Sequence, residues 1–368
     1  MLHFQHRLFY YDEYAGFQAK APLAPDLPIE PGQKRCEAFE YERHGTTGLM
    51  AFLMAELLKH DNKGKIFMFQ PAYINLYKTG KLLERIENAQ NLLKERQMCP
   101  RRCKVNRLEN KMGVCKVGRL PKVSSYNPHF GEESPLVGMH GSGTIFITSC
   151  NLGCVFCQNY DISHLGEGYE ISLERLAQMM IELQNMGCHN INFVTPTHVV
   201  PQILEALPIA IRDGLKIPLV YNSGGYDLVD TLQLLEGVFD IYMPDFKFSD
   251  DNTAAKLCKA KDYPQIAMDA IREMHRQVGN LLLDERGIAV RGLIVRHLVM
   301  PNELAETRKV MHFLAKNIST NTYVNIMDQY RPCGLAHKYA EINRRISREE
   351  FENAVQIAGE EGIHRLAV

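Results

Sequence analysis

The sequence predicts an α/β protein whose core is an open, partial barrel of six β-α units. Two observations predict this class. Short apolar runs alternate with helical patterns from residue 144 onward, and the six units occupy only about 220 of the 368 residues. Strands that alternate with helices at this spacing favour a parallel sheet with right-handed crossovers. Eight units close a complete barrel of about 250 residues, so six units leave it open.

Each predicted strand is a short apolar run, and each predicted helix repeats apolar residues at a spacing of three or four. The strands are expected at Thr144–Thr148, Ile191–Val194, Pro218–Tyr221, Asp240–Met243, Val290–Val299 and Thr322–Met327. The helices are expected at Leu173–Leu183, Ile203–Ile211, Leu228–Leu235, a longer region over Asn252–Leu283, Leu304–Lys316 and Arg348–Gly359. In such sheets the chemistry lies beyond the carboxyl ends of the strands.

The residues before the first predicted strand lack this alternation. Two helices are expected there, over Thr46–Lys59 and Lys81–Arg96. We therefore expect a mainly helical and irregular N-terminal extension over residues 1–140, followed by the partial barrel over residues 141–368. The extension carries its own cysteine group, Cys99, Cys103 and Cys115.

Composition and charge narrow the function classes. The formal net charge is −1, so no bulk field attracts nucleic acid or an anionic membrane. The N-terminus, Met1–Arg7, lacks a signal-peptide pattern, and the apolar stretch Leu49–Leu58 is too short to span a bilayer. We therefore expect a cytoplasmic protein without a membrane partner. In a reducing compartment, clustered cysteines indicate metal ligands.

The most informative cluster is Cys150, Cys154 and Cys157, which has the spacing C-x3-C-x2-C directly after the first predicted strand. Three thiolates within eight residues can converge on one metal centre. They cannot fill the four ligand positions of a structural zinc site or of an ordinary four-iron cluster. The trio therefore predicts a cluster with one iron left open, and an open coordination position indicates catalysis.

This motif, with Phe156 just before its last cysteine and six β-α units around it, resembles the radical S-adenosylmethionine (radical SAM) superfamily. The resemblance covers residues 140–368 and implies a partial (β/α)6 TIM-like barrel. Within the superfamily the chain looks most like the pyruvate formate-lyase activating enzyme-like proteins. Three stretches carry this closer similarity: Cys99–Arg107, Phe193–His198 and Tyr242–Lys247.

The resemblance implies that Cys150, Cys154 and Cys157 hold three irons of a [4Fe–4S] cluster, and that the fourth iron takes S-adenosylmethionine. An electron from a reductant such as flavodoxin or ferredoxin then cleaves this cofactor and produces a 5′-deoxyadenosyl radical. The implied enzyme is an oxidoreductase, and one function is activation of a glycyl-radical enzyme. Radical modification of a small molecule, a peptide or RNA is an alternative. An iron–sulfur electron carrier or a structural metal module is the non-enzymatic alternative.

Polar residues at the predicted strand ends are the candidates for binding S-adenosylmethionine. Superfamily members often carry a Gly-Gly-Glu run after the second strand, where this chain has Thr195-Pro196-Thr197-His198. The candidate set is Thr195, Thr197, Asn222, Ser223, Asp245, Lys247 and Arg296. Arg296 and His297 are expected on opposite faces of their strand. A tight turn or an internal ion pair is the alternative for each candidate, and His198 and Asp328 are substrate-side candidates.

The cysteine group in the extension has three interpretations. Cys99, Cys103 and Cys115 form a second metal site if Cys36, His129 or His140 supplies a fourth ligand. A metal-free knob, or a redox or substrate-contacting role, are the alternatives. We expect the isolated Cys188, Cys258 and Cys333 to be small buried apolar residues.

Overall fold

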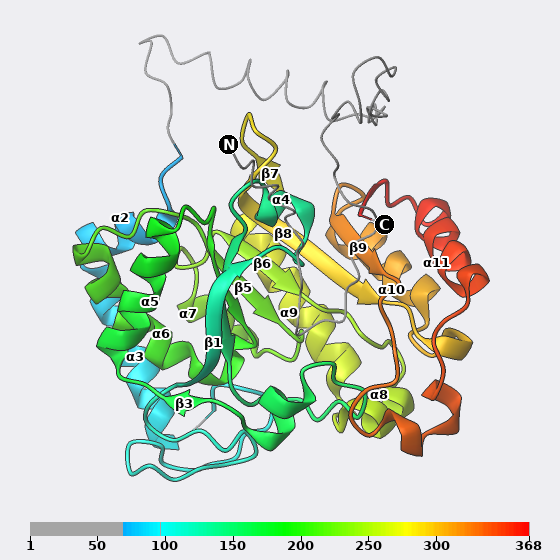
Figure 1. Cartoon of the computed structure of the whole chain (residues 1–368), viewed down its shortest axis with the longest axis horizontal. Coiled ribbons are helices and arrows are strands. Elements are labelled where there is room, and N and C mark those ends of the chain that lie inside the picture. Colours follow the sequence, from blue (N-terminus) through cyan, green and yellow to red (C-terminus); the bar gives the residue numbers. More distant parts are fainter. Residues whose placement is uncertain (1–68, 96, 368) are drawn as a thin grey trace, which may run out of the picture. The chain divides into compact units, whose positions relative to one another are not determined.

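The computed structural model describes residues 69–95 and 97–367 (Figure 1). The predicted helix over Thr46–Lys59 and the candidate ligand Cys36 lie outside these residues. No helix in the described part is long and apolar enough to cross a membrane.

The strands form an open sheet in the order β10-β9-β8-β6-β5-β4-β2-β1-β3, with β7 paired to β8. The bonds between β2, β4, β5, β6, β8, β9 and β10 are all parallel, whereas β1 is antiparallel to β2 and to β3. The strand bounds are β1 Lys122–His129, β2 Ser142–Ile147, β3 Tyr169–Glu170, β4 Ile191–Val194, β5 Leu219–Ser223, β6 Ile241–Pro244, β7 Leu282–Leu283, β8 Ala289–Leu298, β9 Tyr323–Met327 and β10 Arg365–Ala367.

Helices connect the parallel strands and cover one face of the sheet (Figure 1). Their bounds are α2 Ala72–Lys78, α3 Lys81–Glu95, α4 Ser134–Val137, α5 Leu173–Asn185, α6 Val200–Arg212, α7 Val229–Leu234, α8 Asp251–Cys258, α9 Tyr263–Val278, α10 Thr307–Phe313 and α11 Arg348–Glu360. Short 3-10 or π segments are η1 Asp161–Leu165, η2 Pro196–Val199, η3 Pro301–Glu303, η4 Leu314–Ile318, η5 Ala336–Lys338 and η6 Ala340–Ile342.

Successive side chains of the central strands point to opposite faces of the sheet and so belong to two separate apolar clusters. Tyr221 and Tyr242 belong to the large cluster that the helices share. Their neighbours Val220 and Met243 belong to a second cluster on the opposite face, which also contains Leu136 of α4. Because both faces are covered, the parallel strands are buried almost throughout, as is typical of β-α sheets.

The predicted fold class is confirmed. The six predicted strands correspond to β2, β4, β5, β6, β8 and β9, and the long helical region divides into α8 and α9. The sequence reasoning missed β1, whose side chains are mostly half-buried or exposed and which pairs antiparallel with β2 and, over two residues, with β3. It also missed α2 and the short strands β3, β7 and β10. The predicted domain boundary after residue 140 lies between β1 and β2, and it stays a prediction.

Candidate functional site

The cysteine loop that follows β2 is fastened to the end of α8. The N–H groups of Gly153 and Val155 donate to the carbonyls of Cys258 and Leu257, at 3.0 and 2.8 Å. Both carbonyls belong to the last turn of α8, where no N–H of the same helix is available to donate to them. The loop is thereby held against a helix that lies about a hundred residues later in the chain.

Each thiol of the trio has a neighbour at its sulfur. The N–H of Leu152 donates to Cys150 Sγ at 3.3 Å, and the Ser163 hydroxyl donates to Cys157 Sγ at 3.2 Å. The Sγ atoms of Cys154 and Cys258 lie 3.2 Å apart. Donors aimed at thiolate sulfur tune the potential of iron–sulfur clusters. We expected Cys258 to be a small buried apolar residue. It is fully buried, but it also contacts the trio.

The environment of the trio opposes free thiolates. Burial raises the pKa of Cys150 and Cys157, and contact with Cys258, followed by burial, raises the pKa of Cys154. The positive charge of Lys247 opposes this rise in pKa at all three thiols. Lys247 also lies near the cysteine loop, since a Cβ on Gly224 would be 2.9 Å from Leu152 and 3.8 Å from Lys247. Buried thiols of this kind ionise when a metal centre supplies positive charge.

A charged network lies at the carboxyl ends of β5, β6 and β8. Asp245 accepts hydrogen bonds from Lys247 Nζ at 2.5 Å and from Arg296 Nε at 2.7 Å. Arg296 Nη2 also donates to Asn222 Oδ1 at 2.7 Å. Burial alone would raise the pKa of Asp245, but Arg296 and Lys247 hold it below its ordinary value. The structure thus brings together four of the seven predicted cofactor-binding residues.

Two glutamates from the loop before α4 reach the same arginine. Carboxylate oxygens of Glu132 and Glu133 lie 3.7 and 3.9 Å from Arg296. Burial and the neighbouring Glu133 raise the pKa of Glu132 to about 7. The sequence reasoning missed both residues, because they precede the first predicted strand and only the fold carries them to the sheet.

The other three predicted cofactor-binding residues, Thr195, Thr197 and Ser223, hold the turns that follow β4 and β5. The hydroxyls of Thr197 and Ser223 donate to Asp227 at 2.7 and 2.6 Å, and the Tyr221 hydroxyl donates to it at 2.8 Å. Thr195 has a left-handed φ of 60°, and its N–H donates to the Asn222 carbonyl. Asp227 therefore ties the ends of β4 and β5 together, and sequence reasoning did not single it out.

The structure places the remaining candidates His198, His297 and Asp328 as follows. His198 is buried, and its Nε2 lies 2.8 Å from the Thr148 carbonyl. His297 is buried between the Phe246 carbonyl and the Thr307 hydroxyl, so it faces the helices while Arg296 faces the charged network. The predicted opposite orientation of these neighbours is confirmed. Asp328 is exposed just beyond β9.

The second cysteine group is not drawn together with its candidate histidines. Arg107 donates to Cys115 Sγ at 2.9 Å and to the His198 carbonyl, which follows the carboxyl end of β4. His129 and His140 flank the amino end of the parallel strand β2, at the opposite end of the sheet. Neither histidine is therefore placed to complete a site with Cys115.

Within residues 69–95 and 97–367, no three His, Cys, Asp or Glu side chains converge closely enough to hold a single metal ion. Cysteines that bind different irons of a cube are spread more widely than the ligands of one ion. The donor set of the trio fits such a cube, because it combines three soft thiols, sulfur-directed donors and a nearby ammonium.

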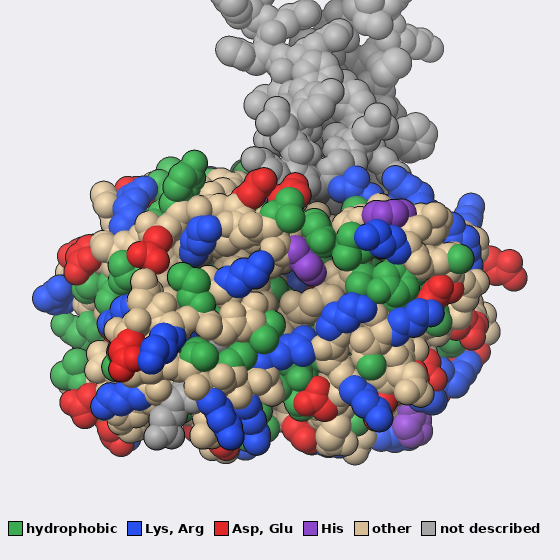
Figure 2. Space-filling view, turned by 90° about the horizontal axis from the view of Figure 1, so that it is seen from below, with side chains coloured by type: hydrophobic (Ala, Val, Ile, Leu, Met, Phe, Trp, Pro, Cys, Tyr) green, Lys and Arg blue, Asp and Glu red, His purple; other side chains and the backbone are tan. Residues whose placement is uncertain are grey.

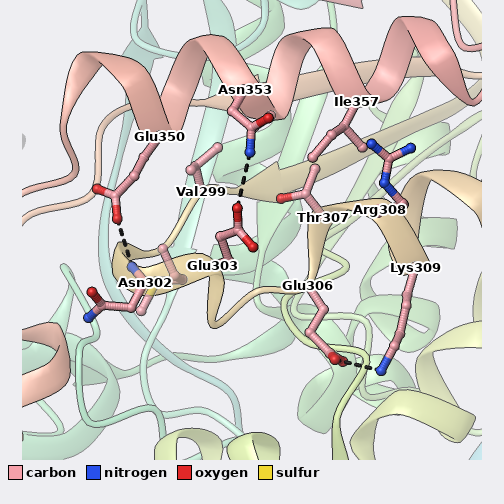
Figure 3. A pocket seen from close by; sticks show the side chains of 12 residues that line it. Val299, Asn302, Glu303, Glu306, Thr307, Arg308, Lys309, Glu350, Asn353 and Ile357 are labelled. Atoms are coloured by element: carbon pink, nitrogen blue, oxygen red, sulfur yellow. Dashed lines mark hydrogen bonds and ion pairs between the residues drawn. The ribbon is translucent and has the colours of Figure 1, made fainter.

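A cavity of about 670 Å³ lies elsewhere, between η3, α10 and α11 (Figure 3). Its polar side chains are paired with one another. Asn353 donates to Glu303 at 3.1 Å, and Lys309 donates to Glu306 at 2.5 Å. None of the predicted site residues lines it.

Comparison with known proteins identifies the family. The model of the radical SAM superfamily matches residues 144–314, which include the cysteine trio and the charged network. The chain belongs to the radical SAM superfamily. The uncharacterized protein MJ0674 of Methanocaldococcus jannaschii is 38% identical over 286 residues, which are 74% of this chain and 77% of that protein.

Two solved structures are also similar to this radical SAM chain. One is TYW1 with a lysine-pyruvate adduct bound, with 11% identity and a TM-score of 0.40 over 63% of this chain and 75% of that one. The other is HydG, a maturase of the [FeFe]-hydrogenase, with 15% identity and a TM-score of 0.43 over 80% of this chain and 65% of that one. Membership of the superfamily makes the protein an enzyme of radical chemistry that uses a [4Fe–4S] cluster and S-adenosylmethionine.

Proposed function

We propose that Cys150, Cys154 and Cys157 ligate three irons of the [4Fe–4S] cluster. The observation that carries this assignment is the position of the trio. It directly follows the first parallel strand, it has a donor at two of its sulfurs, and Lys247 lies near its loop. When bound, the cluster supplies the electron that divides S-adenosylmethionine into methionine and the 5′-deoxyadenosyl radical.

We propose that the charged network binds S-adenosylmethionine next to the cluster. Lys247 links the two sites, because it acts on the three thiols and donates to Asp245. Arg296 is held in place by Asp245 and Asn222, and its planar donor group suits a carboxylate. Thr197 and Ser223 act through Asp227, which fixes the turns that border the network.

The finer proposal is an oxidoreductase of the pyruvate formate-lyase activating enzyme-like group that activates a glycyl-radical enzyme. Its support is the similarity of the Cys99–Arg107, Phe193–His198 and Tyr242–Lys247 stretches to that group. The open sheet also agrees with it, since a protein loop that receives the radical must reach the strand ends. Radical modification of a small molecule, a peptide or RNA is the alternative function.

The ligand assignment is tested by anaerobic reconstitution with iron and sulfide. We expect about four irons per chain if only the trio binds a cluster, and the reduced protein should form 5′-deoxyadenosine. Cys154→Ala should lose both the cluster and this product. Cys188→Ala is the matched control, because Cys188 is equally buried but lies between α5 and β4. Full turnover by Cys154→Ala would refute the assignment.

The partner is tested by adding a candidate glycyl-radical enzyme to the reduced protein. An activase produces a protein radical that is visible by electron paramagnetic resonance. If 5′-deoxyadenosine forms without this signal, the alternative function is favoured. For the second cysteine group, a metal site remains a proposal with Cys36 as the fourth ligand, because His129 and His140 lie at the opposite end of the sheet. Cys103→Ala should then lower the iron or zinc content. Unchanged metal content would show that the group holds no metal.

A further inference from the structure

Positive charge is concentrated in one short segment of this nearly neutral chain. Residues 97–122 contain eight lysine or arginine residues and one glutamate, a formal charge of +7 in a protein whose net charge is −1. We call this stretch the basic segment. Such a local excess attracts an acidic partner and speeds its association, even when the whole protein has no net field.

Three cations of the basic segment are available to a partner. Arg102, Lys104 and Lys116 are exposed and make no ion pair with another described residue. The other cations are engaged within the protein: Lys111 pairs with Glu109, Arg119 pairs with Glu205, and Arg107 is fully buried. The available charge is therefore on the outer surface and is not neutralised locally.

The basic segment borders the cysteine loop. Arg101 Nε donates to the Asn151 carbonyl at 2.8 Å, and its Nη1 donates to the Lys259 carbonyl at 2.6 Å. The basic segment therefore contacts the cysteine loop through Arg101, the direct neighbour of the exposed Arg102.

A further exposed cation joins this surface from α8. The Lys259 side chain lies over the loop glycine Gly153, where an added Cβ would come within 3.1 Å of it. The space-filling view from below shows Lys and Arg side chains spread over this face of the protein (Figure 2).

The same segment exposes aliphatic side chains between its charges. Met112 and Val114 are 53% and 58% exposed, and Leu108 is 40% exposed. Apolar groups set among charges are typical of protein interfaces, which combine an apolar centre with a polar rim. Single-stranded nucleic acid is bound on aromatic side chains, and residues 97–122 contain no aromatic residue. The surface therefore fits an acidic protein better than RNA.

We propose that the basic segment is the docking surface for an acidic one-electron carrier protein, such as a reduced flavodoxin. This inference rests on the proposed function of the trio. One electron passes from the reduced carrier, which is oxidised by one electron, to the cluster at Cys150, Cys154 and Cys157, which is reduced by one. Docking beside the cysteine loop shortens the path that this electron travels.

The test compares two reductants on the reconstituted holoenzyme. In the triple variant Arg102→Glu/Lys104→Glu/Lys116→Glu, 5′-deoxyadenosine formation with reduced flavodoxin should fall about tenfold or more at low salt. Formation with dithionite, a small reductant that needs no docking surface, should stay within about twofold. Added salt should slow the flavodoxin-driven reaction of the native protein and narrow its difference from the variant.

The control variant Lys216→Glu/Lys316→Glu/Arg348→Glu changes the net charge equally at exposed positions outside the basic segment. It should retain the flavodoxin-driven rate. An unchanged rate in the basic-segment variant, or an equal loss in the control, would overturn the proposal. So would loss of RNA binding by the basic-segment variant with no loss of flavodoxin-driven turnover.

Direct binding separates this proposal from the proposed function. The dissociation constant for oxidised flavodoxin, measured by titration calorimetry, should rise about tenfold in the basic-segment variant and stay unchanged in the control. This measurement requires no turnover. If dithionite drives no cleavage in the native protein, the proposed function fails, and the calorimetry still decides whether flavodoxin docks on the basic segment.

Discussion

The Asp245→Asn substitution tests how the charged network is held together. Asp245 lies between two cations, with Lys247 Nζ at 2.5 Å and Arg296 Nε at 2.7 Å. The three side chains are only 13%, 16% and 17% exposed, so water screens them poorly. Asparagine keeps the size of the side chain and one acceptor oxygen but removes the negative charge. The variant therefore leaves two buried cations beside each other.

The expected cost follows from the remaining partners. Removing one member of a buried ion pair costs about 3–5 kcal/mol. Glu132 and Glu133 still lie 3.7 and 3.9 Å from Arg296, so Lys247 is the cation that loses its partner. We therefore expect the lower end, about 3 kcal/mol of unfolding free energy. For a chain of this size that lowers Tm by roughly 4–5 °C.

The loss of stability in Asp245→Asn should also depend on pH. Since the pKa of Asp245 in the folded protein lies below its ordinary value of 3.8, its stabilisation is present above that value and is lost as pH falls through the folded pKa. The difference in stability between native protein and variant should therefore be full at neutral pH. It should shrink below about pH 4.

The assay is urea unfolding of both proteins at several pH values, with Asp245→Asn/Lys247→Met as the matched double variant. Removing the stranded ammonium should restore at least about 1 kcal/mol, because the uncompensated charge is gone. A single variant that loses less than about 1 kcal/mol would refute the reasoning. A double variant that is less stable than the single one would refute it as well.

Three further predictions concern single positions. Burial and Glu133 raise the pKa of Glu132 to about 7, so ionisation of this carboxyl group destabilises the fold. Glu132→Gln should therefore gain stability relative to the native protein, by on the order of 1–3 kcal/mol, as pH rises from about 5 to about 8. A pH-independent difference in urea unfolding would contradict this. Gly225→Ala should cost more than about 2 kcal/mol, since its φ is +77° and a Cβ would lie 2.3 Å from the Asp245 carbonyl oxygen. Gly80→Ala, with φ +75° and nothing within 4 Å, should cost only about 1–2 kcal/mol, and equal losses in urea unfolding would show that the close contact is unimportant. Ser347→Ala removes the capping box of α11 and should cost about 1 kcal/mol in thermal unfolding, whereas an unchanged Tm would show that the cap contributes nothing.

Much of the fold was accessible from the sequence because each element carries a local signal. The run Ile191–Val194 was predicted from its apolar character and forms β4 over the same residues, and Ser347 and Gly187 lie where helices begin and end. The strand β1 escaped prediction, because its side chains are mostly half-buried or exposed and its polar residues gave no apolar alternation. The position of Arg296 opposite His297 followed from strand geometry alone.

The candidate site divides in the same way. The spacing of Cys150, Cys154 and Cys157 lies within eight residues, so a single stretch of sequence was enough to predict the metal and the family. The neighbours of that trio come from far along the chain. Cys258 reaches Cys154 only because the end of α8 packs against the loop, and Glu132 reaches Arg296 only because the fold brings the loop before α4 to β8. No local pattern encodes these contacts.

By itself the sequence determined the chemistry, since three closely spaced thiols and a β-α repeat are local properties of the chain. The tertiary structure alone decided which charges meet. It joined Asp245 to Lys247 and Arg296, turned Thr197 and Ser223 toward Asp227, and brought the basic segment beside the cysteine loop. The physical reason is that burial and electrostatic pairing depend on distances in space, which packing sets between residues that the sequence keeps apart.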